Sequence, residues 1–321
     1  MTRIGYHCSH EQYPPSELLR WVGAAEAAGF GAAMCSDHIH PWTPDQGHSG
    51  FAWSFLGAAL QATSLSFGVV TVPGGWRYHP AVLAQAAATL SEMYPDRFWL
   101  AAGSGEALNE RVVGRGWPSK QERNTRLAEG VDIMRALWRG EEVTRAEPIP
   151  TESARVYSLP ARPPRVYAAA LTAGTARFAG AWADGLITTG RPPDDLREMM
   201  DAFAEGGGDG KPVVVQAGFA LGETEDGALG EACSEWGCLF LEPDLLGNLR
   251  RPADFAAAAA ALRPEDLRGK LPVVTSAQHA IDWLAPLTEL GLEEIQLHCV
   301  NRRQDEFIDL FGHRVLPALT G

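Results

Sequence analysis

The sequence has few of the features that mark secreted, membrane-spanning or nucleic-acid-binding proteins. Its five cysteines are irregularly spaced and include no CxxC pair, which indicates reduced thiols rather than disulfides. No window reaches the roughly 18 consecutive apolar residues of a membrane helix, and no signal-peptide pattern opens the chain. Basic residues form no runs, and the formal net charge of -13 disfavours a phosphate-backbone partner. We therefore expect a soluble, cytoplasmic protein with no nucleic-acid or membrane partner.

Several catalytic signatures are also missing. The chain contains no GxSxG nucleophile elbow, no Walker A loop and no GxGxxG dinucleotide fingerprint. Serine hydrolases, P-loop NTPases and enzymes with a classical dinucleotide fold are therefore not indicated.

The chain does contain a regular alternation of two kinds of segment. Short continuous apolar runs, typical of parallel strands buried on both faces, alternate with segments of helical period. The expected strands are 3–9, 32–38, 65–72, 98–105, 165–171, 185–190, 212–221 and 294–300. The expected helices include 15–28, 80–93, 120–138, 173–182 and 194–204. This pattern predicts an α/β fold, a single (β/α)8 TIM barrel over residues 1–321.

Two regions depart from this rhythm, at about 140–164 and about 237–270, and the second has an alanine-rich helical stretch. We expect both to be insertions at the C-terminal face of the barrel, where long connections form lids or pocket walls. Near the first helix, Ser16 is the expected N-cap and Gly29 the expected stop.

The strand end at 36–42, with the sequence SDHIHPW, carries the strongest chemical signal. The C-terminal strand ends hold the active site in barrels of this kind. His38 is the candidate acid or base, because the histidine pKa lies near neutrality, and Trp42 offers a flat aromatic wall. Asp37 and His40 complete the motif, although His40 could equally hydrogen-bond the loop backbone.

A second motif, GSGEALNE at 103–110, begins at the C-terminal end of the strand expected at 98–105. Its glycines allow the backbone to approach a ligand closely, and a helix that starts just after them suits anions or carbonyls. Glu106 would then be a second proton-transfer group. The alternative is a tight turn in which Glu106 caps a helix.

The HxH pair formed by His38 and His40 raises the alternative of a metal-dependent hydrolase. A catalytic zinc needs three converging protein ligands. The strand ends near 171 and 189 supply only Ala, Leu and Thr, and a third nitrogen could come only from the remote His298 or His48. We predict no metal site.

Taken in series, SDHIHPW, the segment Trp76-Arg77-Tyr78-His79-Pro80 and GSGEALNE resemble the luciferase-like oxidoreductase superfamily over essentially the whole chain. The resemblance is strongest to its F420-dependent glucose-6-phosphate dehydrogenase branch, and especially to a subgroup expected to use FMN instead of F420. It implies a barrel enzyme that works with a flavin-type ring and a small-molecule substrate, and it suggests a homodimer.

The resemblance also implies residue roles. His38, Glu106 and Trp42 would be catalytic. The cofactor would be contacted by Asp37, Val70, Thr71, Ser104, Gly105, Asn109, Ala170 and Leu171. Val70-Thr71 matches the position of a non-prolyl cis peptide bond in the family, a bond that persists only where function requires it.

The expected substrate is less well defined. Candidate contacts are His40, Thr188, Arg191 and Lys270. In the sugar-phosphate dehydrogenases a third cation would stand near 305–306, where this chain has Asp305 and Glu306. An acidic replacement weakens phosphate binding, so glucose 6-phosphate is not the expected substrate, although Arg302 and Arg303 lie nearby in the sequence.

The choice of cofactor rests on the third strand end, where Pro73 replaces a cofactor-contacting threonine and favours FMN. The prediction is an FMN-dependent monooxygenase or hydride-transfer enzyme. The alternatives are an F420-dependent dehydrogenase, the metal-dependent hydrolase and a non-catalytic flavin carrier.

Overall fold

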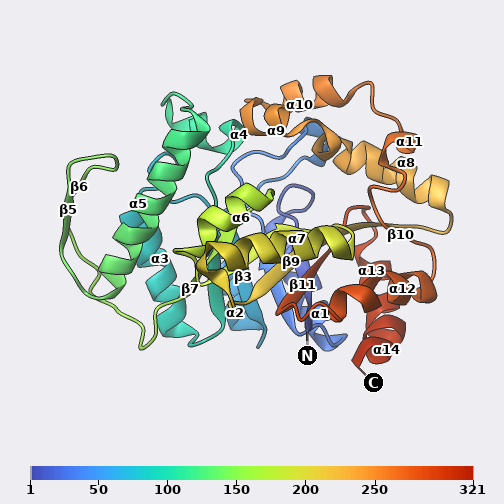
Figure 1. The fold of residues 1–321 in the computed structure, drawn as a ribbon. Coiled ribbons are helices and arrows are strands. Elements are labelled where there is room, and N and C mark those ends of the chain that lie inside the picture. The colour runs from blue at the N-terminus through green and yellow to red at the C-terminus, as the bar shows by residue number, and fades with distance from the viewer. Residues whose placement is uncertain (1, 321) are drawn as a thin grey trace.

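The computed structural model describes residues 2–320, whose parallel strands close into a barrel surrounded by helices (Figure 1). The barrel strands are β1 (Arg3–Cys8), β2 (Ala32–Cys35), β3 (Ser66–Thr71), β4 (Phe98–Ala102), β7 (Arg165–Ala169), β8 (Gly185–Thr189), β9 (Val213–Leu221) and β11 (Glu294–Cys299). They pair in the order β9-β11-β1-β2-β3-β4-β7-β8, and the pairing of β8 with β9 closes the ring. The predicted (β/α)8 barrel is therefore confirmed, with each expected strand in place.

Helices cover the outside of the barrel between the strands. They include α1 (Pro15–Ala27), α2 (Ala52–Ala62), α3 (Pro80–Met93), α4 (Ala107–Glu110), α5 (Lys120–Trp138), α6 (Ala173–Gly180), α7 (Pro193–Phe203), α8 (Glu225–Trp236), α12 (Ala277–Thr288), α13 (Gln304–Leu310) and α14 (Leu316–Thr320). Within residues 2–320, none of the helices is both long enough and apolar enough to cross a membrane.

The first helix corrects one prediction. Pro15 opens α1 and Pro14 stands at the N-cap without a side-chain cap, so Ser16 lies inside the first turn and does not cap it. Proline suits the first helical position because its missing N–H would have no helical partner there. Gly29 does follow the helix, with a φ of 98° that favours glycine.

Large side chains fill the barrel because small residues stand opposite them. A Cβ atom on Gly68 would lie 2.1 Å from the Trp99 ring, and one on Gly185 would lie 2.4 Å from the Tyr167 ring. The rings of Trp99 and Tyr167 pack together at 4.9 Å between centroids. The interior is therefore a packed core, which leaves the C-terminal ends of the strands to form the site.

The connection at 140–164 is not helical but contains an antiparallel pair, β5 (Val143–Arg145) and β6 (Thr151–Ala154). It follows α5 and therefore leaves from the N-terminal face of the barrel, not the expected C-terminal face. It then extends along the outside of α5 (Figure 1). The loop between β5 and β6 still approaches the strand ends, because Ile149 packs on Gly75 and His79 Nε2 donates to the Pro150 carbonyl at 2.9 Å.

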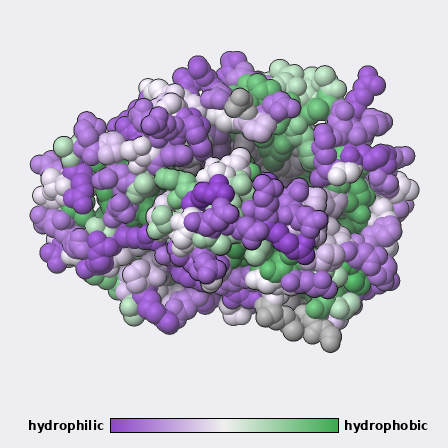
Figure 2. All heavy atoms as spheres, in the orientation of Figure 1, coloured by the Kyte–Doolittle hydropathy of each residue, from purple (hydrophilic) through white to green (hydrophobic). Residues whose placement is uncertain are grey.

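The connection at 237–270 is helical, as expected. It contains η4 (Gly237–Phe240), α9 (Pro243–Asn248), α10 (Pro252–Ala259) and α11 (Pro264–Leu267), and it leads to the short strand β10 (Val273–Val274). The surface over α10 is apolar, whereas most of the same face is hydrophilic (Figure 2). Beneath that surface the buried Phe255 packs edge-to-face on Trp42 at 5.3 Å, so this insertion covers the loop after β2.

Candidate active site

His38 lies just beyond β2 and is held between two carboxylates. Its Nδ1 atom is 2.9 Å from Glu11 Oε1, and its Nε2 atom is 3.5 Å from Glu106 Oε1. The Trp42 ring packs edge-to-face on the imidazole at 5.0 Å. The side chain retains 16% exposure. The structure thus brings together the three residues predicted to be catalytic and adds Glu11.

Glu11 was not identified from the sequence, because it lies beyond the first strand, which was expected at 3–9. Its carboxylate is buried and accepts hydrogen bonds from Ser9 at 3.0 Å and Ser36 at 2.8 Å as well as contacting His38. Its place shortly after the C-terminal end of a barrel strand could have marked this carboxylate as a candidate functional residue.

The two partners change each other's protonation. Burial alone would lower the pKa of His38, but the charge and hydrogen bond of Glu11, with the charge of Glu106, outweigh burial and raise it. Burial alone would raise the pKa of Glu11, but the charge and hydrogen bond of His38 hold it well below its usual range. The pair therefore favours an imidazolium facing a carboxylate.

Asn109 fixes the second carboxylate to the loop after β2. Its Nδ2 atom donates to Glu106 Oε1 at 2.7 Å, and its Oδ1 atom accepts from the backbone N–H of Ile39 at 2.9 Å and of His40 at 3.3 Å. Glu106 stands at the N-cap of α4 without a side-chain cap bond, so the capping alternative is wrong. His40 Nδ1 lies 3.2 Å from the Leu108 carbonyl, which is the backbone-bonding alternative for that residue.

Asp37 is engaged by protein donors on both oxygens. Arg77 Nη1 at 3.1 Å and the Tyr78 hydroxyl at 3.0 Å donate to Oδ1, and the Thr71 hydroxyl donates to Oδ2 at 2.8 Å. Arg77 also lies 3.4 Å from Glu110, whose pKa burial raises to about 7 against the opposing effect of Arg77. Asp37 therefore ties the turn after β3 to the end of β2.

Val70 and Thr71 lie at the end of β3. Both remain in the regular ladder with β4, opposite Ala101 and Ala102, and Val70 faces the barrel interior. The one cis peptide bond within residues 2–320 joins Glu147 to Pro148. The cis bond expected between Val70 and Thr71 is thus not present.

Ser104 and Gly105 lie beside an uncompensated basic pair. Ser104 accepts a hydrogen bond from Lys120, and Arg123 stacks over Trp117 at 4.6 Å. Burial lowers the pKa of both Lys120 and Arg123, and neither has a carboxylate within ion-pair distance in the part of the chain described. Cations without an ion-pair partner suit an anionic group of a ligand.

Ala170 and Leu171 follow β7. Ala170 is buried in the core, and its neighbour Ala169 faces the barrel interior instead. Leu171 is 60% exposed, and its carbonyl accepts a hydrogen bond from Arg191 at 2.8 Å.

Thr188 and Thr189 differ in orientation because strand side chains alternate. Ile187 faces the barrel interior, so Thr188 faces the surrounding helices, where its hydroxyl is buried without a partner. Thr189, and not the predicted Thr188, is therefore the exposed residue at the C-terminal end of the strand.

The residues considered for phosphate binding are either exposed or already paired with other residues of the protein. Lys270 is exposed near the end of the helical insertion. Asp305 accepts from Trp21 and Arg20 of α1. Arg302 and Arg303 form ion pairs with Glu235 and Glu231, respectively.

The HxH pair does not converge. His38 contacts two carboxylates, while His40 bonds a backbone carbonyl. Among the side chains that the structure describes, no three His, Cys, Asp or Glu are grouped so as to hold a metal ion.

A second histidine pair lies deeper in the barrel. The rings of His7 and His298 are 4.6 Å apart, and both are buried. Gln216 Nε2 lies 3.4 Å from His7 Nε2, and His298 Nε2 lies 3.2 Å from the Gln12 amide oxygen. Burial lowers the pKa of His7 to about 4 and lowers that of His298 well below its usual value. Both rings are therefore neutral at pH 7.

Comparison with known proteins shows the family of the chain. Residues 1–294 match the family described as luciferase-like monooxygenase. An F420-dependent glucose-6-phosphate dehydrogenase of Nakamurella multipartita is 34% identical over 99% of this chain and 96% of its own length. A solved F420-dependent secondary alcohol dehydrogenase, in complex with an F420-acetone adduct, has a TM-score of 0.89 at 30% identity and 99% coverage of both chains. The oxygenating constituent of 3,6-diketocamphane monooxygenase from Pseudomonas putida, in complex with FMN, shares the fold at a TM-score of 0.70 and 17% identity, with 99% of both chains covered.

Proposed function

The chain belongs to the luciferase-like monooxygenase family, and we propose that it is an F420-dependent dehydrogenase that oxidises a hydroxyl group of a small organic substrate. One observation carries the proposal: His38 lies between Glu11 and Glu106, where its neutral form could accept a proton and the resulting imidazolium would be stabilised. The relatives with 30% identity or more described above use F420, whereas the FMN-bound relative is more distant. F420 therefore replaces FMN as the preferred cofactor.

The residues at the strand ends fit a ring with an anionic side chain. Gly103 and Gly105 let the backbone approach a ligand, and Gly105 has a φ of 77°, which favours glycine. Lys120 and Arg123 lack carboxylate partners among the described residues and would hold the anionic side chain. When bound, F420 would supply the hydride acceptor.

The chain's own contribution is proton transfer. When neutral His38 carries its proton on Nδ1, the nitrogen that faces Glu11, the lone pair on Nε2 is free to take the hydroxyl proton of the substrate. The bond between that proton and the substrate oxygen breaks while the carbon gives up its hydride. Glu11 stabilises the resulting imidazolium, and Glu106 lies where it can accept a hydrogen bond from the new Nε2–H.

Trp42 limits the access of water to this proton transfer. Its ring lies between the His38 imidazole and Phe255 of the insertion. Exclusion of water strengthens the interaction between imidazolium and carboxylate.

The test is to titrate the purified protein with F420 and with FMN in parallel, and then to add secondary alcohols and glucose 6-phosphate. We expect binding of F420 and loss of its oxidised absorbance with an alcohol, but not with glucose 6-phosphate. Binding of FMN without binding of F420 would overturn the proposal. His38→Asn should retain F420 binding while losing reduction.

A further inference from the structure

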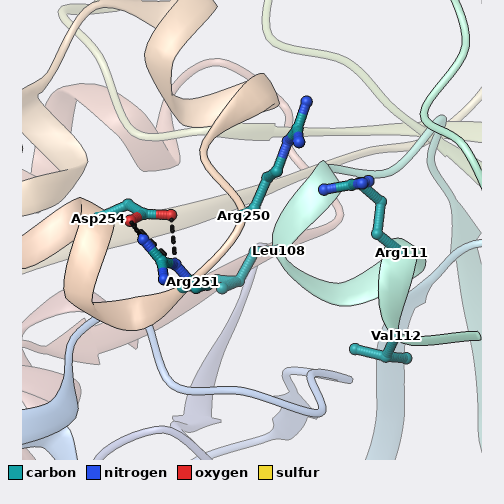
Figure 3. Close-up of a pocket in the computed structure, with 6 residues that line it drawn as sticks. All are labelled: Leu108, Arg111, Val112, Arg250, Arg251 and Asp254. Carbon is teal, nitrogen blue, oxygen red and sulfur yellow. Dashed lines mark hydrogen bonds and ion pairs between the residues drawn. The ribbon is translucent and has the colours of Figure 1, made fainter. Parts of the chain in front are cut away.

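A hollow of about 450 Å³ is lined by residues of α4, of η2 (Arg111–Val113), of α10 and of the segment that joins α9 to α10. We call it the arginine hollow. It is lined by Leu108, Arg111, Val112, Arg250, Arg251 and Asp254 (Figure 3). Its walls thus come from the GSGEALNE region and from the helical insertion.

The charges of the arginine hollow are unbalanced. Arg251 pairs with Asp254, with Nη2 2.6 Å from Oδ1, which accounts for the one carboxylate among the lining side chains that the structure describes. Arg111 and Arg250 have no ion-pair partner among the described residues, and Arg111 Nε is buried without a hydrogen bond. Both guanidinium groups point into the same space (Figure 3). Two like charges that face each other repel unless an anion lies between them.

A second hollow shows that this arrangement is not general on the surface of the protein. That hollow, of about 440 Å³, lies between α6 and α7 and contains Arg177 and Arg197. There Arg177 pairs with Glu205 and Arg197 pairs with Asp194, so both arginines are neutralised internally.

We propose that the arginine hollow binds a phosphoryl group, either as free phosphate or as the end of an organic phosphate ester. Guanidinium groups hold phosphate oxygens in pairs of parallel hydrogen bonds. The volume exceeds what one phosphate fills and lies in the usual range for small-molecule sites. The paired Arg251 forms a third cationic wall beside Arg111 and Arg250. This site goes beyond the proposed dehydrogenase function and uses none of its residues.

The site would join two elements that support the active site. Leu108, in its wall, accepts a hydrogen bond from His40 through its carbonyl, and Asp254 precedes the Phe255 that packs on Trp42. A phosphoryl group in the hollow would therefore link α4 to the insertion.

The test is calorimetric titration of the full chain with inorganic phosphate and, separately, with phenyl phosphate, in chloride buffer of constant ionic strength. We expect saturable binding of one equivalent. The double variant Arg111→Gln/Arg250→Gln should bind at least about tenfold more weakly. Arg197→Gln, at the internally paired hollow, should bind as the parent does.

The outcomes separate clearly. Equal binding of both probes identifies free phosphate as the ligand, and tighter binding of the ester identifies the end of a larger ligand; both support the site. No saturation by about 10 mM probe, or unchanged affinity in a double variant with a native circular dichroism spectrum, would overturn it. None of these results depends on F420 reduction, so the site and the dehydrogenase proposal can fail separately.

Discussion

His38 and His298 lie in the same barrel, and the protein moves their pKa values in opposite directions. His38 has carboxylates near both ring nitrogens, and its pKa is raised. His298 has the Gln12 amide and the Trp236 ring as neighbours, and its pKa is lowered well below the usual value.

The difference shows what decides the charge of a buried histidine. Burial acts in the same direction on both rings, toward the neutral form. At His38 the carboxylates reverse that effect, Glu11 contributing most and Glu106 less. Proton chemistry is thus confined to the ends of β1, β2 and β4, while the His7–His298 pair forms a neutral polar layer.

The largest expected effect comes from substitution of His38 itself. His38→Asn should lower kcat/KM for F420 reduction by about 10²–10⁴-fold, because it removes the proton acceptor. His298→Gln is the matched control and should change kcat/KM only slightly, since it lies outside the carboxylate pair. Steady-state kinetics measures both variants, and equal losses of kcat/KM would refute the comparison between the two histidines.

The buried ion pairs near His38 can be tested through the stability of the protein. Arg77→Met leaves Asp37 and Glu110 without their buried cation and should lower the free energy of unfolding by about 3–5 kcal/mol. Arg20→Met, which breaks the exposed pair with Asp305, should cost about 1 kcal/mol or less. Urea denaturation measures both, and similar losses would contradict the assigned role of Arg77.

The neutral pair predicts a dependence of stability on pH. The pKa of His7 is about 4 in the folded protein, below the unfolded value of about 6.5. As pH falls from about 6.5 to about 4.5 the unfolded chain takes up this proton and the folded chain does not, so stability falls by about 2–3 kcal/mol. His7→Gln should remove this part of the loss between the two pH values. An unchanged pH dependence in urea denaturation would show that His7 is not held neutral.

The smallest expected effect concerns Glu11. Glu11→Gln should lower the pKa of His38, because the charge that favours imidazolium is lost. The neutral base then exists at lower pH, and the rising limb of kcat/KM against pH should move in that direction. NMR titration of the His38 ring checks the pKa directly. If the dependence of kcat/KM on pH does not change in Glu11→Gln, the rising limb reports the titration of another group.

The strands could be predicted because each is a continuous buried run that local composition identifies. The contact between Asn109 and Glu106 was also within reach, since both belong to one motif. Partners from distant segments were not. Arg77 reaches Asp37 from 40 positions away, and no local pattern reports such a pairing.

Single-residue errors have equally simple causes. The choice of Thr188 over Thr189 depends on the parity of a strand, which a shift of one residue inverts. Ser16 is a good cap by residue type, but Pro15 already begins the helix. The connection at 140–164 was recognised by its length, while its direction depends on tertiary contacts such as that between Ile149 and Gly75.

The amide of Asn109 has one further consequence. It bonds Glu106 with one end and the backbone after His38 with the other, so the loops after β2 and β4 behave as one mechanical part. A shift that carries His38 sideways carries Glu106 with it and preserves their separation. Substitutions at these two residues should therefore combine non-additively, whereas the walls around them can diverge without altering the distance over which the proton moves.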